Sequence, residues 1–208
     1  MAVRLVILAS GRGSNFSAIA EAIRQKKIPG AEIVGLVSNN PEAPALLLAR
    51  EKGIPTTIID AKSFGRGKLF DRASYESALI EVVHRLSPDL ICLAGYMLLL
   101  GESFLKHWPN QIVNIHPSLL PSFRGLRAQK QALDYGVQWT GCTVHWVNEE
   151  LDGGPIIAQE ILEVLPQDDE DSLSTRLLEV EHRTYIKALG MLCSQAYQID
   201  GRRMRWNP

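Results

Sequence analysis

The sequence has few cysteines, almost no net charge and no long hydrophobic segment. Its three cysteines, Cys92, Cys142 and Cys193, lie in apolar surroundings without the spacing of metal ligands. We therefore expect reduced thiols, no disulfide and no bound metal. A net charge of -1 offers no broad surface for nucleic acid. No apolar run approaches the roughly 18 residues of a membrane span and no signal-peptide pattern opens the chain, so we expect a cytoplasmic protein without a membrane partner.

The remaining pattern is that of an α/β protein. With 208 residues, 46% of them hydrophobic, the chain is long enough for one globular domain. Short buried runs at 4–9, 32–37, 56–59 and 90–94 alternate with helical segments, which predicts a parallel, Rossmann-like open sheet with helices on both faces. Segments 140–147 and 156–164 flank a glycine-rich turn, and we expect them to add antiparallel strands in the C-terminal half.

A glycine-rich turn, Ser10 to Asn15, follows the first predicted strand and precedes a helix that should run to about Gln25. Backbone N–H groups in such a turn, together with the positive end of the helix dipole, form a cradle for an anion. The turn is not a dinucleotide fingerprint, because Phe16 stands where a small residue is required. A phosphate is the expected ligand, although a plain tight turn is the alternative.

The stretch Asn114-Ile115-His116-Pro117 carries polar side chains at the end of an apolar strand. Side chains two apart on a strand point to the same face, so Asn114 and His116 should project together. Pro117 cannot donate to a sheet, which predicts that the strand ends at His116. Ligands of open α/β sheets bind at that end of the strands.

An amide and an imidazole at one strand end suit the stabilisation of an oxyanion and the transfer of a proton, as acyl transfer requires. Asp152, in the turn Glu149 to Pro155, is the carboxylate that can orient the histidine and stabilise its positive charge. No serine or cysteine is placed as a nucleophile. We therefore expect direct transfer between two bound substrates.

Three other features have ordinary structural explanations. The basic residues Arg66, Lys68 and Arg72 in and after the loop 61–68 can face an anionic ligand, but such clusters are usually solvated. The apolar loop Gly95 to Gly101 is either core or the wall of a ligand pocket. Glu181, on the helix predicted for 172–193, has the position of a solvated helical glutamate.

The motif Asn114-x-His116-Pro117-Ser118-Leu119-Leu120-Pro121, with the later Leu151-Asp152-Gly153-Gly154-Pro155, resembles the folate-dependent formyltransferases. The resemblance spans residues 3 to about 192. The short chain and the Gly13-Ser14-Asn15 turn are similar to the members that formylate glycinamide ribonucleotide. The implied organisation is one formyltransferase domain with a phosphate-binding half (1–110), a catalytic and folate half (111–192) and a C-terminal tail (193–208).

The resemblance also implies roles for individual residues. Catalysis is implied for Asn114, His116 and Asp152. Substrate binding is implied for Gly13, Ser14, Asn15 and Glu181. Contact with the folate is implied for Arg72, Met97, Leu98, Leu99, Leu100, Asn114, Thr143 and His145.

The implied reaction is transfer of the formyl group of 10-formyltetrahydrofolate to the amine of glycinamide ribonucleotide in de novo purine biosynthesis, by a monomer or homodimer. Arg124-Gly125 is typical of methionyl-tRNA formyltransferases, and Leu98 replaces a basic residue of certain members. Another amine acceptor, an amino sugar nucleotide or methionyl-tRNA, and a non-catalytic phosphate-binding module are the alternatives.

Overall fold

The computed structural model describes residues 2–206, which form a seven-stranded sheet and a separate two-stranded hairpin. The order of the large sheet is β3-β2-β1-β4-β5-β6-β7. The parallel strands are β1 (Val3–Leu8), β2 (Ala31–Ser38), β3 (Thr56–Ile58), β4 (Leu90–Leu93) and β5 (Ile112–His116). The antiparallel strands are β6 (Trp139–Trp146) and β7 (Ile156–Glu163). The predicted fold class is confirmed.

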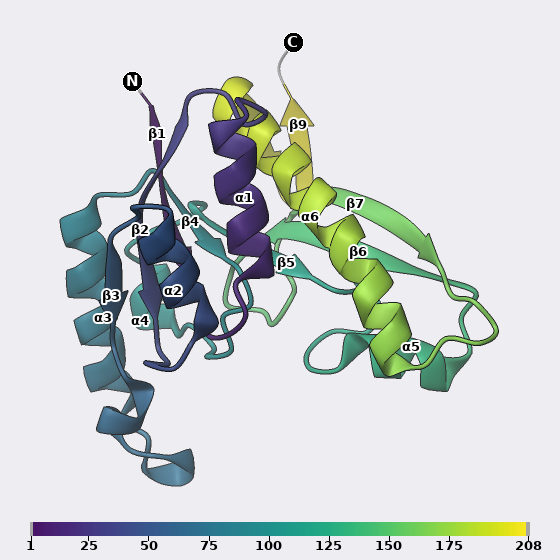
Figure 1. Ribbon diagram of the computed structural model, residues 1–208, viewed down its shortest axis with the longest axis horizontal. Coiled ribbons are helices and arrows are strands. Elements are labelled where there is room, and N and C mark those ends of the chain that lie inside the picture. The colour runs from purple at the N-terminus through teal and green to yellow at the C-terminus, as the bar shows by residue number, and fades with distance from the viewer. Residues whose placement is uncertain (1, 207–208) are drawn as a thin grey trace.

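Helices cover both faces of this sheet (Figure 1). One face packs against α1 (Ser14–Arg24), α2 (Pro44–Glu51) and α6 (Glu170–Ser194). The other packs against α3 (Arg72–Leu86) and the single turn α4 (Glu102–Leu105). A shorter helix, α5 (Ala128–Tyr135), contacts α6 beside the C-terminal strands.

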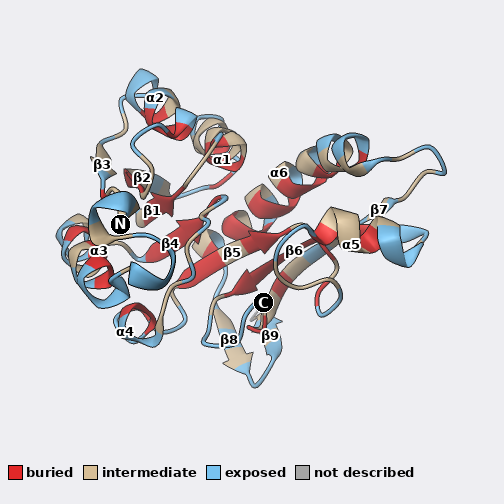
Figure 2. Ribbon diagram, turned by 90° about the horizontal axis from the view of Figure 1, so that it is seen from below, coloured by how far each residue is buried: buried red, intermediate tan, exposed pale blue. Residues whose placement is uncertain are grey.

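The alternation of side chains along the strands produces two hydrophobic cores. In β1, Leu5 and Ile7 belong to the core under α1 and α6, whereas Val6 and Leu8 belong to the core under α3. This is why β1 reads as a continuous apolar run, since both of its faces are buried. Figure 2 shows the same pattern as buried residues through the central strands, with exposed residues in the loops at their ends.

The structure differs from the sequence prediction at the ends of some elements. Helix α6 begins at Glu170 rather than at residue 172, because Asp169 and Ser172 form a capping box that starts the helix earlier. The loop predicted for 61–68 contains two short 3-10 turns, Ala61–Phe64 and Gly67–Leu69. Helix α4 was not predicted, since a single turn is too short to show helical periodicity.

The C-terminal tail forms the hairpin β8 (Tyr197–Asp200) and β9 (Arg203–Trp206), whose turn contains Gly201. The hairpin packs on the main domain, where the indole N–H of Trp146 donates to the sulfur of Met204 at 3.1 Å. Residues 207–208 of the predicted tail lie outside the described residues. Within residues 2–206, no helix combines the length and apolar character needed to cross a bilayer.

Candidate functional site

Asn114 and His116 lie on one face of β5, as the strand pattern predicts. The antiparallel register with β6 places Asn114 opposite His145 and His116 opposite Thr143. The side chain between them, Ile115, enters the core under α6 instead. The pairing of two strands therefore gathers four polar side chains on the face that the loops after β5 and β6 cover.

Asp152 reaches this face from the turn between β6 and β7, in a left-handed backbone conformation with φ of 49°. Its Oδ2 lies 3.4 Å from Nδ1 of His116 and accepts a 2.8 Å hydrogen bond from the backbone N–H of Gly125. Its Oδ1 lies 3.8 Å from Nε2 of His145. The side chains of Asp152 and His116 are both nearly buried. The structure therefore brings Asn114, His116 and Asp152 together.

The backbone fixes the proton on His116. Its Nε2 lies 2.9 Å from the carbonyl oxygen of Phe123, and a carbonyl can only accept, so Nε2 must carry the hydrogen. Nδ1 then faces Asp152 at a distance too long for a strong hydrogen bond. Nδ1 is consequently the atom that can accept a proton and return it.

His145 orients Asn114 in the same way. Its Nδ1 donates to the carbonyl of Trp146 at 2.9 Å, which leaves Nε2 to accept from the Asn114 amide at 3.2 Å. Burial lowers the pKa of His145, outweighing the Trp146 hydrogen bond and the nearby Asp152 charge, which raise it. A neutral His145 thus turns the amide N–H₂ of Asn114 towards the site, with a second hydrogen left for another acceptor.

Thr143 holds the loop that carries Phe123. Its buried hydroxyl donates to the carbonyl of Ser118 at 2.7 Å and accepts from the N–H of Leu120 at 3.0 Å. The amide of Gln159 is a third partner at 2.9 Å. These protein contacts occupy the Thr143 hydroxyl, and its predicted contact with the folate stays a prediction.

The turn between β1 and α1 has the features of an anion cradle. Gly13 adopts φ of 77°, and a Cβ there would lie 2.7 Å from that of Ala45, so the position requires glycine. No side chain caps the helix N-terminus at Gly13, which leaves the N–H groups of its first turn available. The predicted phosphate site therefore has a suitable backbone.

Asn15 and Glu181 form the inner wall of this cradle. The amide of Asn15 donates to Glu181 Oε2 at 2.9 Å, while the Oδ1 atom of Asn15 is buried without a partner among the described residues. Glu181 is 8% exposed, and burial raises the pKa of its carboxyl against the lowering effects of the Asn15 hydrogen bond and the Arg12 charge. Glu181 is therefore not a solvated helix residue.

The apolar loop after β4 divides into two sets of side chains. Leu98 and Leu100 pack against the core under α3, whereas Met97 and Leu99 are 69% and 61% exposed. The Arg72 guanidinium donates to the carbonyl of Leu99. The core interpretation is therefore confirmed for Leu98 and Leu100, and the pocket wall at Met97 and Leu99 stays a prediction.

Ser10 joins this apolar loop to the phosphate cradle, and sequence reasoning missed it. Its N–H donates to the Gly95 carbonyl at 3.1 Å, and its hydroxyl accepts from the N–H of Met97 at 2.8 Å. β1 and β4 are neighbours in the sheet, so their carboxyl ends meet at this point. A serine in a turn carries no signal of its own, and only that adjacency could have indicated the contact.

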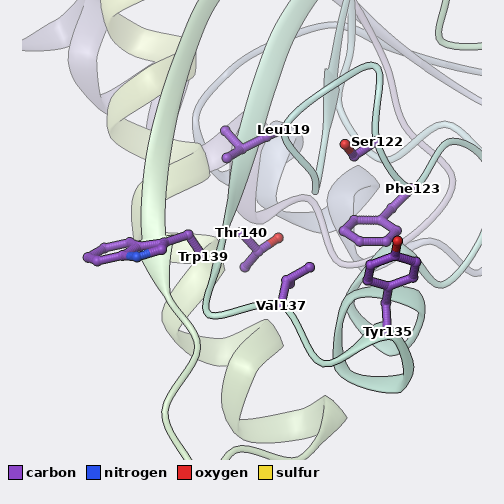
Figure 3. A pocket seen from close by; sticks show the side chains of 7 residues that line it. All are labelled: Leu119, Ser122, Phe123, Tyr135, Val137, Trp139 and Thr140. Atoms are coloured by element: carbon purple, nitrogen blue, oxygen red, sulfur yellow. The ribbon is translucent and has the colours of Figure 1, made fainter.

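A separate pocket of about 370 Å³ lies beside the loop after β5. Figure 3 shows Phe123 and Tyr135 side by side in its lining, with Trp139 on the opposite side. Asn114, His116 and Asp152, here called the trio, contribute no side chain to the lining. Elsewhere, no group of three or more potential metal ligands occurs within the described part of the chain.

Comparison with known proteins is consistent with this arrangement. The profile of the family described as Formyl transferase matches residues 3–189. The chain therefore belongs to the formyl transferase family. Phosphoribosylglycinamide formyltransferase of Escherichia coli (strain K12) is 39% identical, with 97% of this chain and 96% of that protein covered.

Two further relatives extend this comparison. The solved structure of glycinamide ribonucleotide transformylase 1 from Symbiobacterium toebii has a TM-score of 0.92 and 39% identity, covering 99% of this chain and 94% of that one. The trifunctional purine biosynthetic protein adenosine-3 of Gallus gallus is 44% identical over 95% of this chain. The chain spans 19% of the length of that trifunctional protein.

Proposed function

We propose that the protein transfers the formyl group of 10-formyltetrahydrofolate to the amine of glycinamide ribonucleotide, a step of purine biosynthesis. The observation that carries this proposal is the convergence of Asn114, His116 and Asp152 beside two loops that Ser10 joins. One loop supplies a phosphate cradle and the other exposes apolar side chains. The named relatives of similar length support the same acceptor.

Each member of the trio has a distinct part in the transfer. The amine attacks the formyl carbon directly, and negative charge develops on the formyl oxygen. The second amide hydrogen of Asn114 is directed at that charge. Nδ1 of His116 takes the proton released by the amine and returns it to the departing nitrogen, while Asp152 stabilises the imidazolium in between.

The substrates fit the two loops by their chemistry. The phosphate of the acceptor binds at Gly13, Ser14 and Asn15, where the first turn of α1 presents its N–H groups. Glu181, with Asn15, binds the polar groups of the same nucleotide. On the other side, Met97 and Leu99 offer apolar surface to the ring system of the folate. The family resemblance adds Leu98, Leu100, Arg72 and His145 to this contact.

A direct assay tests this function. Purified protein is incubated with 10-formyltetrahydrofolate and glycinamide ribonucleotide, and the formation of tetrahydrofolate is followed by absorbance and that of the formylated nucleotide by mass spectrometry. An amino sugar nucleotide and methionyl-tRNA serve as competing acceptors. The proposal requires turnover that depends on the glycinamide nucleotide. Faster turnover of another acceptor would overturn it.

Two further properties stay predictions from the sequence. One is a cytoplasmic location, and the other is an oligomeric state of monomer or homodimer.

A further inference from the structure

Arg12 provides a charge at the phosphate cradle that the proposed roles do not yet use. It is the only charged residue between the end of β1 and Gly13, and its side chain is exposed. Its guanidinium forms no hydrogen bond or ion pair with any of the described residues, 2–206. Exposed arginines elsewhere are often paired, as Arg24 is with Glu21 at the far end of α1.

The backbone that carries Arg12 is held in place beside the cradle. The turn it belongs to is held by two hydrogen bonds. The Asn40 amide donates to the carbonyl of Ser10 at 3.2 Å, and the N–H of Ala45 donates to the carbonyl of Gly11 at 3.1 Å. Arg12 directly precedes Gly13, the residue at the N-terminus of α1, so its side chain leaves the backbone at the edge of the cradle.

The cradle needs such a charge. A phosphate monoester brings up to two negative charges next to the Glu181 carboxyl, whereas a helix N-terminus supplies only about half a positive charge. Independently, the buried and unpartnered Oδ1 of Asn15, a residue 7% exposed, indicates a ligand group that donates a hydrogen bond, such as a ribose hydroxyl.

We propose that Arg12 binds the phosphate of the acceptor and makes the enzyme select a phosphorylated glycinamide nucleoside over its unphosphorylated form. This inference rests on the proposed function. The guanidinium donates to two phosphate oxygens at once, which fits the planar fork of arginine better than the single point charge of lysine. The first turn of α1 binds the remaining oxygens through backbone N–H groups.

The test compares Arg12→Ala and Arg12→Lys with the matched control Arg24→Ala, which removes the same charge from the other end of α1. Loss of charge-assisted hydrogen bonds should raise KM for glycinamide ribonucleotide about tenfold or more in Arg12→Ala. KM for the folate donor should not change, and kcat should change far less than KM. Arg12→Lys should recover part of the loss, and Arg24→Ala should equal wild type.

Two further measurements make the outcome decisive. Activity with unphosphorylated glycinamide riboside should be the same in wild type and Arg12→Ala, and inorganic phosphate should compete with the acceptor less strongly in the variant. An unchanged KM for the ribonucleotide in Arg12→Ala, or an equal rise in Arg24→Ala, would overturn the inference. If the wild type has no transferase activity, the proposed function fails instead, and calorimetric titration with inorganic phosphate still decides whether Arg12 binds phosphate.

Discussion

At the scale of single residues, hydrogen bonds within the protein determine which ring nitrogen of each histidine carries the hydrogen. The carbonyl of Phe123 occupies Nε2 of His116, and the carbonyl of Trp146 occupies Nδ1 of His145. The hydrogen on each ring is therefore assigned by an acceptor that cannot change its role. Nδ1 of His116 and one amide hydrogen of Asn114 are therefore the atoms to which we assign the proposed reaction.

Replacing either of these side chains by alanine should remove most of the turnover. An oxyanion donor is worth roughly 3 to 4 kcal/mol, and a general acid–base residue contributes roughly a hundredfold to ten-thousandfold. Asn114→Ala and His116→Ala should therefore each lower kcat by on the order of a hundredfold or more. Steady-state rates with both substrates saturating measure the effect. His84→Ala, which removes an exposed histidine on α3, is the control. Near-normal kcat in either site variant would exclude the assigned role.

Glu181→Gln should stabilise the protein at high pH and weaken the binding of the acceptor. Because burial raises the pKa of Glu181 above its usual 4.5, the folded state binds the proton more tightly than the unfolded state. The free energy of unfolding therefore falls as pH rises from about 4.5 through the folded pKa. Glu181→Gln lacks this loss of stability. Its Tm should therefore exceed that of the wild type by more at pH 8 than at pH 4.

The control for that comparison is Glu179→Gln on the exposed side of the same helix, whose Tm difference from wild type should not follow this pH dependence. KM for glycinamide ribonucleotide should rise in Glu181→Gln but not in the control. An advantage in Tm that is the same at both pH values would show that burial does not raise the pKa of the Glu181 carboxyl.

At the scale of elements, the sequence was most informative where both faces of a segment are buried or where the faces alternate. The buried runs at 4–9 and 90–94 predicted the strands β1 and β4, and the segment 140–147 predicted the antiparallel strand β6. These patterns predict strands correctly because hydrophobic burial acts on side chains, which the sequence specifies directly.

The contacts made by backbone atoms of loops were not predictable. Phe123 and Gly125 act through a carbonyl and an N–H that every residue except proline possesses, so no residue type marks them. Ser10 is a similar case, since its partners come from a loop 85 or more residues away. The residues of the trio were therefore readable from the sequence, whereas the backbone contacts that orient them were not.

The two loops that close over His116 are linked by one carboxylate. Glu150 accepts hydrogen bonds from Arg124, next to Gly125, and from Arg202 at 3.3 Å in the C-terminal hairpin. All three side chains are partly exposed, so the pairs are screened by solvent and salt. We expect Glu150→Gln to lower kcat several-fold at low ionic strength, and to match the wild type in high salt.

A double-mutant cycle with Arg124→Gln measures how far this effect comes from the pair. The double variant should lose no more activity than either single variant, because both remove the same contact. Glu149→Gln, the neighbouring carboxylate, is the control and should behave as wild type. Additive losses would show that Glu150 acts on the site by another route.

At the scale of the whole molecule, the two halves predicted from the sequence share one sheet. Residues 1–110 and 111–192 meet where Ile91 on β4 pairs with Ile112 on β5, and α1 packs against α6 across the same division. The site lies along this junction, with the cradle from the first half and the trio from the second. A molecule that opened at the junction would separate the proposed phosphate site from the side chains to which we assign catalysis.

This arrangement leads us to expect one cooperative unfolding transition. Trp108 is buried in the core under α3 and Trp146 in the core under α6, so each reports one face of the sheet. Because β1 and β4 contribute side chains to both cores, loss of one core exposes a face of the strands that the other core needs. Neither face should unfold alone.

Two proteins with a single tryptophan test this expectation, one retaining Trp108 and the other Trp146, with the remaining tryptophans replaced by phenylalanine. In urea, the fluorescence of each should change at the same midpoint as the far-ultraviolet circular dichroism of that same protein. A midpoint for Trp108 well below that of the dichroism would mean that the α3 face opens first. The single domain would then divide into two units of unequal stability.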